Sequence, residues 1–457
     1  EIIMFKRLLF LALPMLFGSV LARAQDAATA LPKIPAKIDL QDGDTFVFLG
    51  DSITHQRLYT QYVEDFFYQR FPERRIHFHN AGIGGARAWD ALARVSRDVV
   101  HYKPRYVSIL LGMNDGSYQP FNPEIFATYK KDMTELVGKI KASGATPILM
   151  SPTMFDSRAA RLRDNPNRPR SAEMLSEYNS VLAYYGRWLQ DVATESGASY
   201  VDMFGLLNDL TNDAREKDPA FTMIKDAVHP DAPGQVVMAF AMIEDLGLRS
   251  GVSNIRVQPD GNGGFKATAT GGKVENLKAT NESVEFDWMA KALPWVMPEE
   301  AQLGVKLLNL GHKASKEGLE IHGLASGTYE VVIDDVVIGQ YVDVLLSRHI
   351  ELQNNTQTPQ YQQALQVAML NKQKNEGPVK QLRDGWRSFQ SWARYSRQLE
   401  EQPNNNEIVA VTEKERVKLQ GLEENIQQAE AEAKKIEDEI YKANQPVTRH
   451  YVIRKAR

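Results

Sequence analysis

The stretch TFVFLGDSI, residues 45–53, joins an apolar β-rich run to a turn and then to the start of a helical pattern. Its first five residues have the composition of a buried strand, and Gly50 and Asp51 form the turn that ends it. Ser52 is therefore expected at the end of a strand, where a serine hydroxyl can act as a nucleophile if a base takes its proton. The alternative is structural, because Gly-Asp-Ser is an ordinary turn sequence and Ser52 could simply cap the next helix.

The same alternation of short β-rich runs and longer helical patterns continues to about residue 248. The β-rich runs are residues 45–49, 75–79, 106–111, 146–150 and 199–202, and the helical patterns are residues 58–71, 89–101, 123–142, 171–195 and 233–246. Parallel strands need crossover connections, so this order predicts an α/β fold with a five-stranded parallel sheet covered by helices on both faces. Ligands of such sheets bind beyond the carboxyl ends of the strands, where the motifs described next are expected.

Two further motifs supply groups that could stabilise negative charge on a carbonyl oxygen. Residues 80–85 read NAGIGG after a β-rich run, and Gly85 lets a backbone N–H approach an oxyanion without a side chain in the way. Residues 111–115 read LGMND at the end of the next run, and the Asn114 amide can donate without adding a charge. The alternatives are a glycine turn or a phosphate-binding loop for Gly85 and a routine turn for Asn114, although the spacing matches neither common phosphate motif.

The base is expected in the sequence DAVHP, residues 226–230, just before the last helical pattern. A three-residue spacing within one turn lets Asp226 reach one imidazole nitrogen of His229 and leaves the other nitrogen for the serine. Pro230 and Pro233 discourage an earlier helix start, which leaves His229 on a loop. A lone histidine before a proline is otherwise a surface loop residue, so the catalytic interpretation depends on the joint occurrence of the motifs.

Taken together, the blocks around Ser52, Gly85, Asn114 and His229 resemble the SGNH, or GDSL-like, hydrolase family over about residues 44–248. The resemblance implies a three-layer αβα sandwich of the flavodoxin-like kind and a serine esterase. It implies that Ser52 is the nucleophile, that His229 is the general base and then acid, and that Asp226 orients His229. It also implies an oxyanion hole formed by the Ser52 and Gly85 amides and the Asn114 side chain, with no cofactor and no metal.

The region that follows residue 250 is predicted to be a small antiparallel, β-sandwich-like accessory domain, residues 251–350. Glycines punctuate short alternating runs there, and residues 329–333 and 336–341 flank a turn at Asp334 and Asp335. Trp288 and Trp295 could stack on sugar rings, or they could belong to the core of the domain, as aromatic residues in small β domains usually do.

Residues 355–445 are predicted to be helical and residues 446–457 to be a C-terminal tail. Apolar residues recur in this region with alternating spacings of 3 and 4, the repeat of a coiled-coil seam. The seam consists of Leu419, Leu422, Ile426, Ala429, Ala433, Ile436 and Ile440. We expect a helical hairpin within the chain, with an earlier helix that carries Trp386, Phe389 and Ala393, and self-association through the C-terminal helix is the alternative.

The N-terminal stretch has the pattern of a signal peptide. Lys6 and Arg7 precede an apolar run that is interrupted by Pro14 and Gly18, and we expect cleavage near residue 24 and a periplasmic or secreted protein without a membrane span. The chain has no cysteine, so a disulfide, a cysteine nucleophile and a thiolate metal site are all excluded. A formal net charge of −4 gives no electrostatic reason to expect a nucleic acid partner.

The predicted function is the hydrolysis of carboxylic esters, with a short acyl or acetyl group on a small-molecule or polysaccharide carbohydrate as the expected substrate. The family often carries an acidic residue after the glycine of its second block, where this chain has Ala86 and Arg87, so the resemblance does not carry a substrate preference. The alternatives are a lipid ester acylhydrolase or lysophospholipase, and a catalytically silent scaffold. A metal phosphoesterase built on Asp51, Asp115, Asp226 and His229 is a further alternative.

Overall fold

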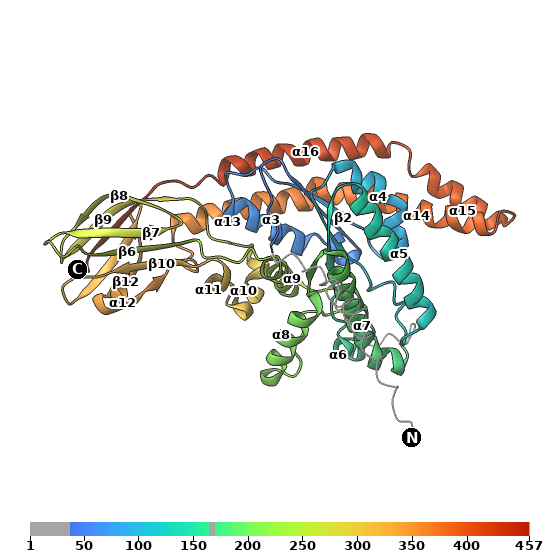
Figure 1. Cartoon of the computed structure of the whole chain (residues 1–457), viewed down its shortest axis with the longest axis horizontal. Coiled ribbons are helices and arrows are strands. Elements are labelled where there is room, and N and C mark those ends of the chain that lie inside the picture. Colours follow the sequence, from blue (N-terminus) through green and yellow to red (C-terminus); the bar gives the residue numbers. More distant parts are fainter. Residues whose placement is uncertain (1–36, 164–169, 457) are drawn as a thin grey trace, which may run out of the picture.

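The computed structural model describes residues 37–163 and 170–456, so the expected signal peptide, residues 1–24, lies outside the described part of the chain. The described chain is elongated, with β-sheets at one end and a helical hairpin tip at the other (Figure 1). The predicted parallel sheet lies between them, beneath one long C-terminal helix.

The central sheet has five parallel strands in the order β2-β1-β3-β4-β5. The strands are β1 (Thr45–Gly50), β2 (His77–Gly82), β3 (Tyr106–Leu110), β4 (Thr146–Met150) and β5 (Ser199–Val201). They are almost wholly buried because helices cover both faces, which explains why they appear in the sequence as continuous apolar runs. The predicted α/β fold with a five-stranded parallel sheet is confirmed.

The helices divide between the two faces as right-handed crossovers require, because the step from β1 to β2 runs opposite to the later steps. On one face α3 (Leu58–Arg70) packs against α9 (Ala232–Asp245). On the other face α5 (Pro123–Ala142) packs against α4 (Ala88–Asp98), and its aromatic residues meet those of α7 (Ala172–Ser196). The remaining helices of this region are α2 (Ser52–His55), η1 (Val100–Tyr102), α6 (Ser157–Leu162) and α8 (Met203–Lys217), of which α8 packs against α9. Sequence patterns predicted neither α6 nor α8.

The β region consists of two further sheets, of strand orders β13-β10-β6-β7 and β12-β11-β14-β9-β8. Their strands are β6 (Ser253–Pro259), β7 (Phe265–Thr270), β8 (Gly272–Ala279), β9 (Ser283–Ala290), β10 (Glu317–Ile321), β11 (Thr328–Ile333), β12 (Val336–Val342), β13 (Ile350–Glu351) and β14 (Arg449–Lys455). The short helices η2 (Glu299–Ala301), α10 (Gln302–Leu308), α11 (Leu310–Ala314) and α12 (Asp343–Arg348) connect them. Pairing is antiparallel throughout, apart from the parallel pair of β6 and β10.

The structure shows the conformation of the β11–β12 turn and the positions of Trp288 and Trp295. The turn between β11 and β12 has positive φ at both Asp334 and Asp335, as a two-residue hairpin turn of the predicted kind requires. Trp288 and Trp295 are both buried, but only Trp288 lies in the core of the β region. Trp295 packs into the core of the parallel-sheet region, where its indole N–H donates to the Tyr62 carbonyl at 3.0 Å.

The prediction of a C-terminal tail at residues 446–457 is wrong. Residues 449–455 form β14, which lies between β11 and β9 in the middle of the larger β-sheet. Tyr451 and Ile453 point into the core of that sheet and are buried. Sequence position suggested a tail, but the chain returns from the helices to complete the sheet with its last strand.

The helical region comprises α13 (Pro359–Lys374), a π-helical turn η3 (Asn375–Val379), α14 (Lys380–Glu401), α15 (Asn406–Val417) and α16 (Leu422–Ala443). The predicted pairing within the chain is confirmed, because α16 packs against both α13 and α14. Most of the predicted seam is buried, and Leu382, Trp386 and Phe389 of α14 join the same apolar core as the parallel sheet. The helices therefore share a core with the parallel-sheet region.

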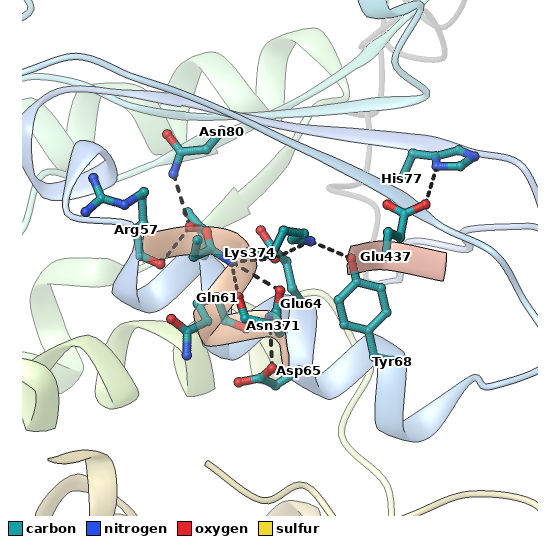
Figure 2. A network of polar contacts seen from close by, with 12 residues as sticks. Arg57, Gln61, Glu64, Asp65, Tyr68, His77, Asn80, Asn371, Lys374 and Glu437 are labelled. Carbon is teal, nitrogen blue, oxygen red and sulfur yellow. Dashed lines mark hydrogen bonds and ion pairs between the residues drawn. The ribbon is translucent and has the colours of Figure 1, made fainter. Parts of the chain in front are cut away.

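A buried polar network joins the helical region to α3 and β2 (Figure 2). The Lys374 ammonium lies 3.0 Å from the Glu64 carboxylate and 2.7 Å from the Tyr68 hydroxyl, and both charged side chains are nearly inaccessible to water. Beside them, the Asn371 amide donates to Asp65 at 2.8 Å. Buried charges are tolerated only when they are paired in this way, so the network fixes one arrangement of α13 against α3.

Candidate active site

Ser52 is the first residue of α2, directly beyond the carboxyl end of β1. Asp51 caps this helix, because its carboxylate accepts the Ile53 amide at 2.9 Å. Burial raises the pKa of Asp51 to about 6, although the hydrogen bond from Ile53 acts in the opposite direction. The cap is therefore provided by Asp51, which leaves the Ser52 hydroxyl available at the strand end.

The three predicted residues of the acid-base relay are joined by two hydrogen-bond contacts. The Ser52 Oγ atom is 2.8 Å from Nε2 of His229, and Nδ1 of His229 is 2.6 Å from Oδ2 of Asp226. The other oxygen of Asp226 accepts the backbone amides of Val228 and His229 at 2.9 and 2.7 Å. Asp226 is thus fixed by its own turn, and it fixes the imidazole with Nε2 toward the serine.

The charges of the relay favour an ionised aspartate beside a basic imidazole. Burial alone would raise the pKa of Asp226, but the hydrogen bonds from the His229 ring and from two backbone amides outweigh it and hold the pKa well below its usual range. The hydrogen bond to Asp226 raises the pKa of His229, against the opposing effect of partial burial. This is the electrostatic arrangement that a general base next to a serine needs.

We therefore expect a pH profile with a single acidic limb. Because only the neutral imidazole can accept the Ser52 proton, kcat/KM should rise with pH through a pKa above 6.5, the ordinary value for histidine. Asp226→Ala should move this limb to lower pH and lower the plateau. Burial raises the pKa of Asp115 to about 7, so Asp115→Asn is the matched control. If Asp115→Asn shifts the acidic limb of the kcat/KM profile and Asp226→Ala leaves it unchanged, the limb does not belong to His229.

The three candidate oxyanion donors follow the carboxyl ends of three neighbouring strands, β1, β2 and β3. Gly85 follows β2 with a φ of +69°, a conformation that glycine adopts without strain. The Asn114 side chain makes only long hydrogen bonds: Nδ2 donates to Asp51 at 3.4 Å and to the Ala86 carbonyl at 3.2 Å, and Oδ1 accepts from the Tyr118 hydroxyl at 3.3 Å. Within residues 37–163 and 170–456, the amides of Ser52 and Gly85 have no hydrogen-bond acceptor. All three groups can therefore donate to an incoming oxygen without giving up a short hydrogen bond.

A cavity of about 700 Å³ opens beside the oxyanion donors, between α4, α5 and α14. Charged and polar side chains provide much of its lining, together with one indole. Its walls include Gly85, Trp89, Asn114, Asp132, Arg394 and Arg397. The Arg397 guanidinium lies over the Trp89 ring at 4.4 Å, a cation–π contact between two of the lining residues.

Sequence reasoning missed the contribution of α14 to this site. Arg394, Arg397 and Gln398 line the cavity, yet they lie about 300 positions after Gly85 in the chain. No local motif marks them, because a charged residue on an amphipathic helix usually faces water. The only signal in the sequence was the apolar face of α14, which indicates that the helix packs against something.

The arrangement of acidic residues does not suit a metal. Among the described residues, no group of three or more histidine, aspartate or glutamate side chains is placed to hold one metal ion. Asp51 and Asp226 are instead engaged by backbone amides, and Asp115 accepts the Ala88 amide at 2.8 Å. The metal phosphoesterase alternative thus has no ligand set in this part of the chain.

Known proteins are similar to this chain both in sequence and in structure. Residues 48–237 match the GDSL-like Lipase/Acylhydrolase family. An acetylxylan esterase from Geobacillus stearothermophilus is 27% identical over 227 residues, which are 45% of this chain and 95% of that protein. The structure of a gut microbial diltiazem-metabolizing enzyme covers 93% of this chain and all of its own at 24% identity, with a TM-score of 0.73. A structure of the acetylxylan esterase, at 25% identity, covers 46% of this chain and 97% of its own, with a TM-score of 0.37.

Proposed function

We propose that this chain, whose residues 48–237 match the GDSL-like Lipase/Acylhydrolase family, is a carboxylic ester hydrolase that acts by acyl transfer to Ser52. The observation that carries this proposal is the relay from Ser52 through His229 to Asp226, with contacts of 2.8 and 2.6 Å. Such a relay activates a hydroxyl that is otherwise a poor nucleophile at neutral pH.

In the first half of the reaction, Ser52 Oγ bonds to the ester carbonyl carbon while its proton passes to Nε2 of His229. The tetrahedral intermediate collapses, the bond to the alcohol oxygen breaks, and the alcohol leaves with the proton that His229 returns. In the second half, His229 takes a proton from water, the resulting hydroxide attacks the acyl carbon, and Ser52 leaves with that proton. Asp226 remains ionised throughout and stabilises the imidazolium that forms twice in each cycle.

The negative charge on the carbonyl oxygen is accommodated by the amides of Ser52 and Gly85 and by the Asn114 side chain. These donors follow the carboxyl ends of β1, β2 and β3, so the strands bring them to one edge of the sheet. Donors that are fixed in advance stabilise the transition state without the cost of reorganising at the moment of reaction.

We propose that the substrate is an acetyl or other short acyl ester of a carbohydrate. The cavity beside Gly85 and Asn114 is lined by carboxylates, guanidinium groups and aromatic side chains, which suit a polyhydroxylated ring better than an acyl chain. The similarity to an acetylxylan esterase supports the same substrate class. A lipid ester is the second candidate, and it is disfavoured by the charge of the cavity walls.

Hydrolysis rates across a graded series of substrates test this proposal. We expect the purified chain to release acetate from acetylated xylo-oligosaccharides and to cleave nitrophenyl acetate faster than nitrophenyl octanoate. The polar cavity should offer little gain for a longer chain, whereas an apolar site would gain about 0.8 kcal/mol per buried CH2 group. Rates that rise with chain length, or preferential hydrolysis of lysophospholipids, would favour the lipid ester instead.

We further propose that the protein is exported. The support is the basic pair Lys6 and Arg7 before an apolar run that ends near Ala24. In the described residues, no helix has the length and apolarity that a membrane crossing requires. Mass spectrometry of the protein from its native cells should find a mature N-terminus near residue 25, and a mature chain that retains the apolar run would contradict export by cleavage.

A further inference from the structure

The loop that carries the Gly85 amide is held from outside the family region, by helix α14. The side-chain amide of Gln390 donates from Nε2 to the Gly84 carbonyl at 3.1 Å. One helical turn later, the Arg394 guanidinium donates to the Gly85 carbonyl at 2.6 Å. Residues at positions i and i+4 share a helix face, so one face of α14 contacts two consecutive peptide groups of the loop.

The contact with Gln390 acts on the peptide group that matters for catalysis. The Gly84 carbonyl and the Gly85 N–H belong to a single planar trans peptide unit, so the two bonds point in opposite directions. A donor that fixes the carbonyl therefore fixes the direction of the N–H. Donation to a carbonyl also polarises its peptide unit, which makes the N–H at the other end a stronger donor.

The contact with Arg394 anchors the same loop to the following helix. Arg394 also donates to both carboxylate oxygens of Asp90 at 2.7 and 2.8 Å, and Asp90 accepts the Arg87 amide at the start of α4. A bidentate guanidinium–carboxylate pair of this kind is directional. Arg394 thus connects Gly85 to the first turn of α4 through one rigid group.

The loop is a turn closed by one backbone hydrogen bond, from the Ala86 amide to the Ile83 carbonyl at 3.1 Å, and α14 adds side-chain contacts to the two peptide groups inside it. Gly84 and Gly85 have no side chains, and a Cβ at either position would contact nothing within 4 Å. On the hydrolase side, the Gly84 amide donates to Nδ1 of His55 at 3.2 Å. Burial lowers the pKa of His55 to about 4, so its ring stays neutral and Nδ1 remains an acceptor at working pH.

The environment of Gln390 indicates a specific role for its donor group. The side chain is buried, and within the described residues its Oε1 atom has no hydrogen-bond partner. A buried amide with one unpaired oxygen costs free energy, and an apolar side chain of similar length would avoid this cost. What Gln390 supplies here, and an apolar residue could not, is the hydrogen bond to the Gly84 carbonyl.

We propose that Gln390 is a positioning residue for the oxyanion hole, that Arg394 assists it, and that the C-terminal helices are therefore part of the catalytic unit. The proposal rests on the proposed function, in which the Gly85 amide stabilises the oxyanion. It assigns to α14, which lies outside residues 48–237, a role in turnover as well as in packing.

The test compares Gln390→Met with Gln381→Met in the full-length chain. Both remove an amide from α14, but Gln381 is exposed, near the start of the helix and away from the loop. Loss of an oxyanion donor costs about 100- to 1000-fold in turnover, and a misdirected donor should cost less, about tenfold in kcat with KM nearly unchanged. Gln381→Met should match the wild type.

A second measurement separates positioning from simple stability. A boronic acid that forms a tetrahedral adduct with Ser52 should bind Gln390→Met about tenfold more weakly, in parallel with the loss of kcat, because it mimics the transition state. Arg394→Met, at a half-exposed side chain, should fold even where Gln390→Met does not, and it should show the same fall in kcat and in boronate affinity.

The outcomes distinguish this inference from the proposed function. Wild-type kcat and boronate affinity in both Gln390→Met and Arg394→Met, while Ser52→Ala is inactive, would overturn the inference alone. Full activity in Ser52→Ala would instead overturn the proposed function. An increase in KM with unchanged kcat would assign α14 to substrate binding only, which also contradicts positioning.

Discussion

Replacing Ser52 with alanine is expected to lower kcat for any carboxylic ester by roughly 10⁴- to 10⁶-fold while the protein remains folded. The hydroxyl forms the covalent bond to the acyl group, and no other nucleophile can replace it in the same position, 2.8 Å from His229. Because Ser52 and His229 act as one unit, the double variant with His229→Ala should be little worse than either single variant. Steady-state rates with nitrophenyl acetate measure all three.

The matched control is Ser143→Ala, at an exposed serine that follows the last residue of α5 and lies outside the site. It should keep the wild-type rate. A fluorophosphonate probe, which reacts with activated serines, should label the wild type and Ser143→Ala at Ser52 and should leave Ser52→Ala unlabelled. Turnover by Ser52→Ala within tenfold of the wild type, or labelling of another serine, would show that the nucleophile lies elsewhere.

The candidate site was predictable because each motif is a short stretch of sequence and the parallel sheet brings the stretches together at one edge. Gly50-Asp51-Ser52, Gly85 and Asn114 each follow a strand of one parallel sheet, and the carboxyl ends of such strands meet at one edge. Asp226 and His229 are three residues apart, so their contact is set by a single turn. In each case the physical cause acts over a few residues, and a few residues were enough to predict it.

The features that sequence reasoning missed depend on contacts between distant segments. The apolar alternation of residues 449–455 is compatible with a strand, but nothing local indicates that β14 inserts between β9 and β11. In the same way, the apolar face of α14 predicts burial without naming the surface that covers it. Gln390 meets Gly84 across 306 positions of the chain, a distance at which hydrophobic periodicity carries no information.

A buried ion cluster between α4, β2 and α14 is expected to contribute strongly to the folding stability of the chain. Asp98 is fully buried and lies between two buried arginines, Arg94 on its own helix at 2.5 Å and Arg383 of α14 at 2.8 and 2.9 Å. His79 of β2 contacts the same carboxylate at 3.1 Å. Burial alone would raise the pKa of Asp98, but Arg383 and the other partners hold it well below its usual range, so the carboxylate stays charged.

Asp98→Asn should destabilise the chain by about 3–5 kcal/mol at pH 7, because it leaves two guanidinium groups buried without a counter-charge. Since the folded pKa of Asp98 is depressed, its contribution is fully present above the unfolded value of about 4 and is lost as the pH falls below it. The gap between wild type and Asp98→Asn should therefore be constant from pH 5 to 8 and should narrow only in stronger acid. Urea unfolding at several pH values measures both.

Asp191→Asn is the matched control, because Asp191 forms an exposed ion pair with Arg187 at 2.7 Å on one helix. Its loss should cost less than about 0.5 kcal/mol of folding free energy.

Arg94 also donates to the carbonyls of Gly50 and Ala81, at the ends of the strands that carry Ser52 and the Gly85 loop. Asp98→Asn should thus lower kcat under conditions in which it is still folded, since the same cluster that joins α14 to the hydrolase region also holds the two catalytic loops. If Asp98→Asn unfolds at the same urea concentration as Asp191→Asn and keeps full kcat, the cluster has neither role.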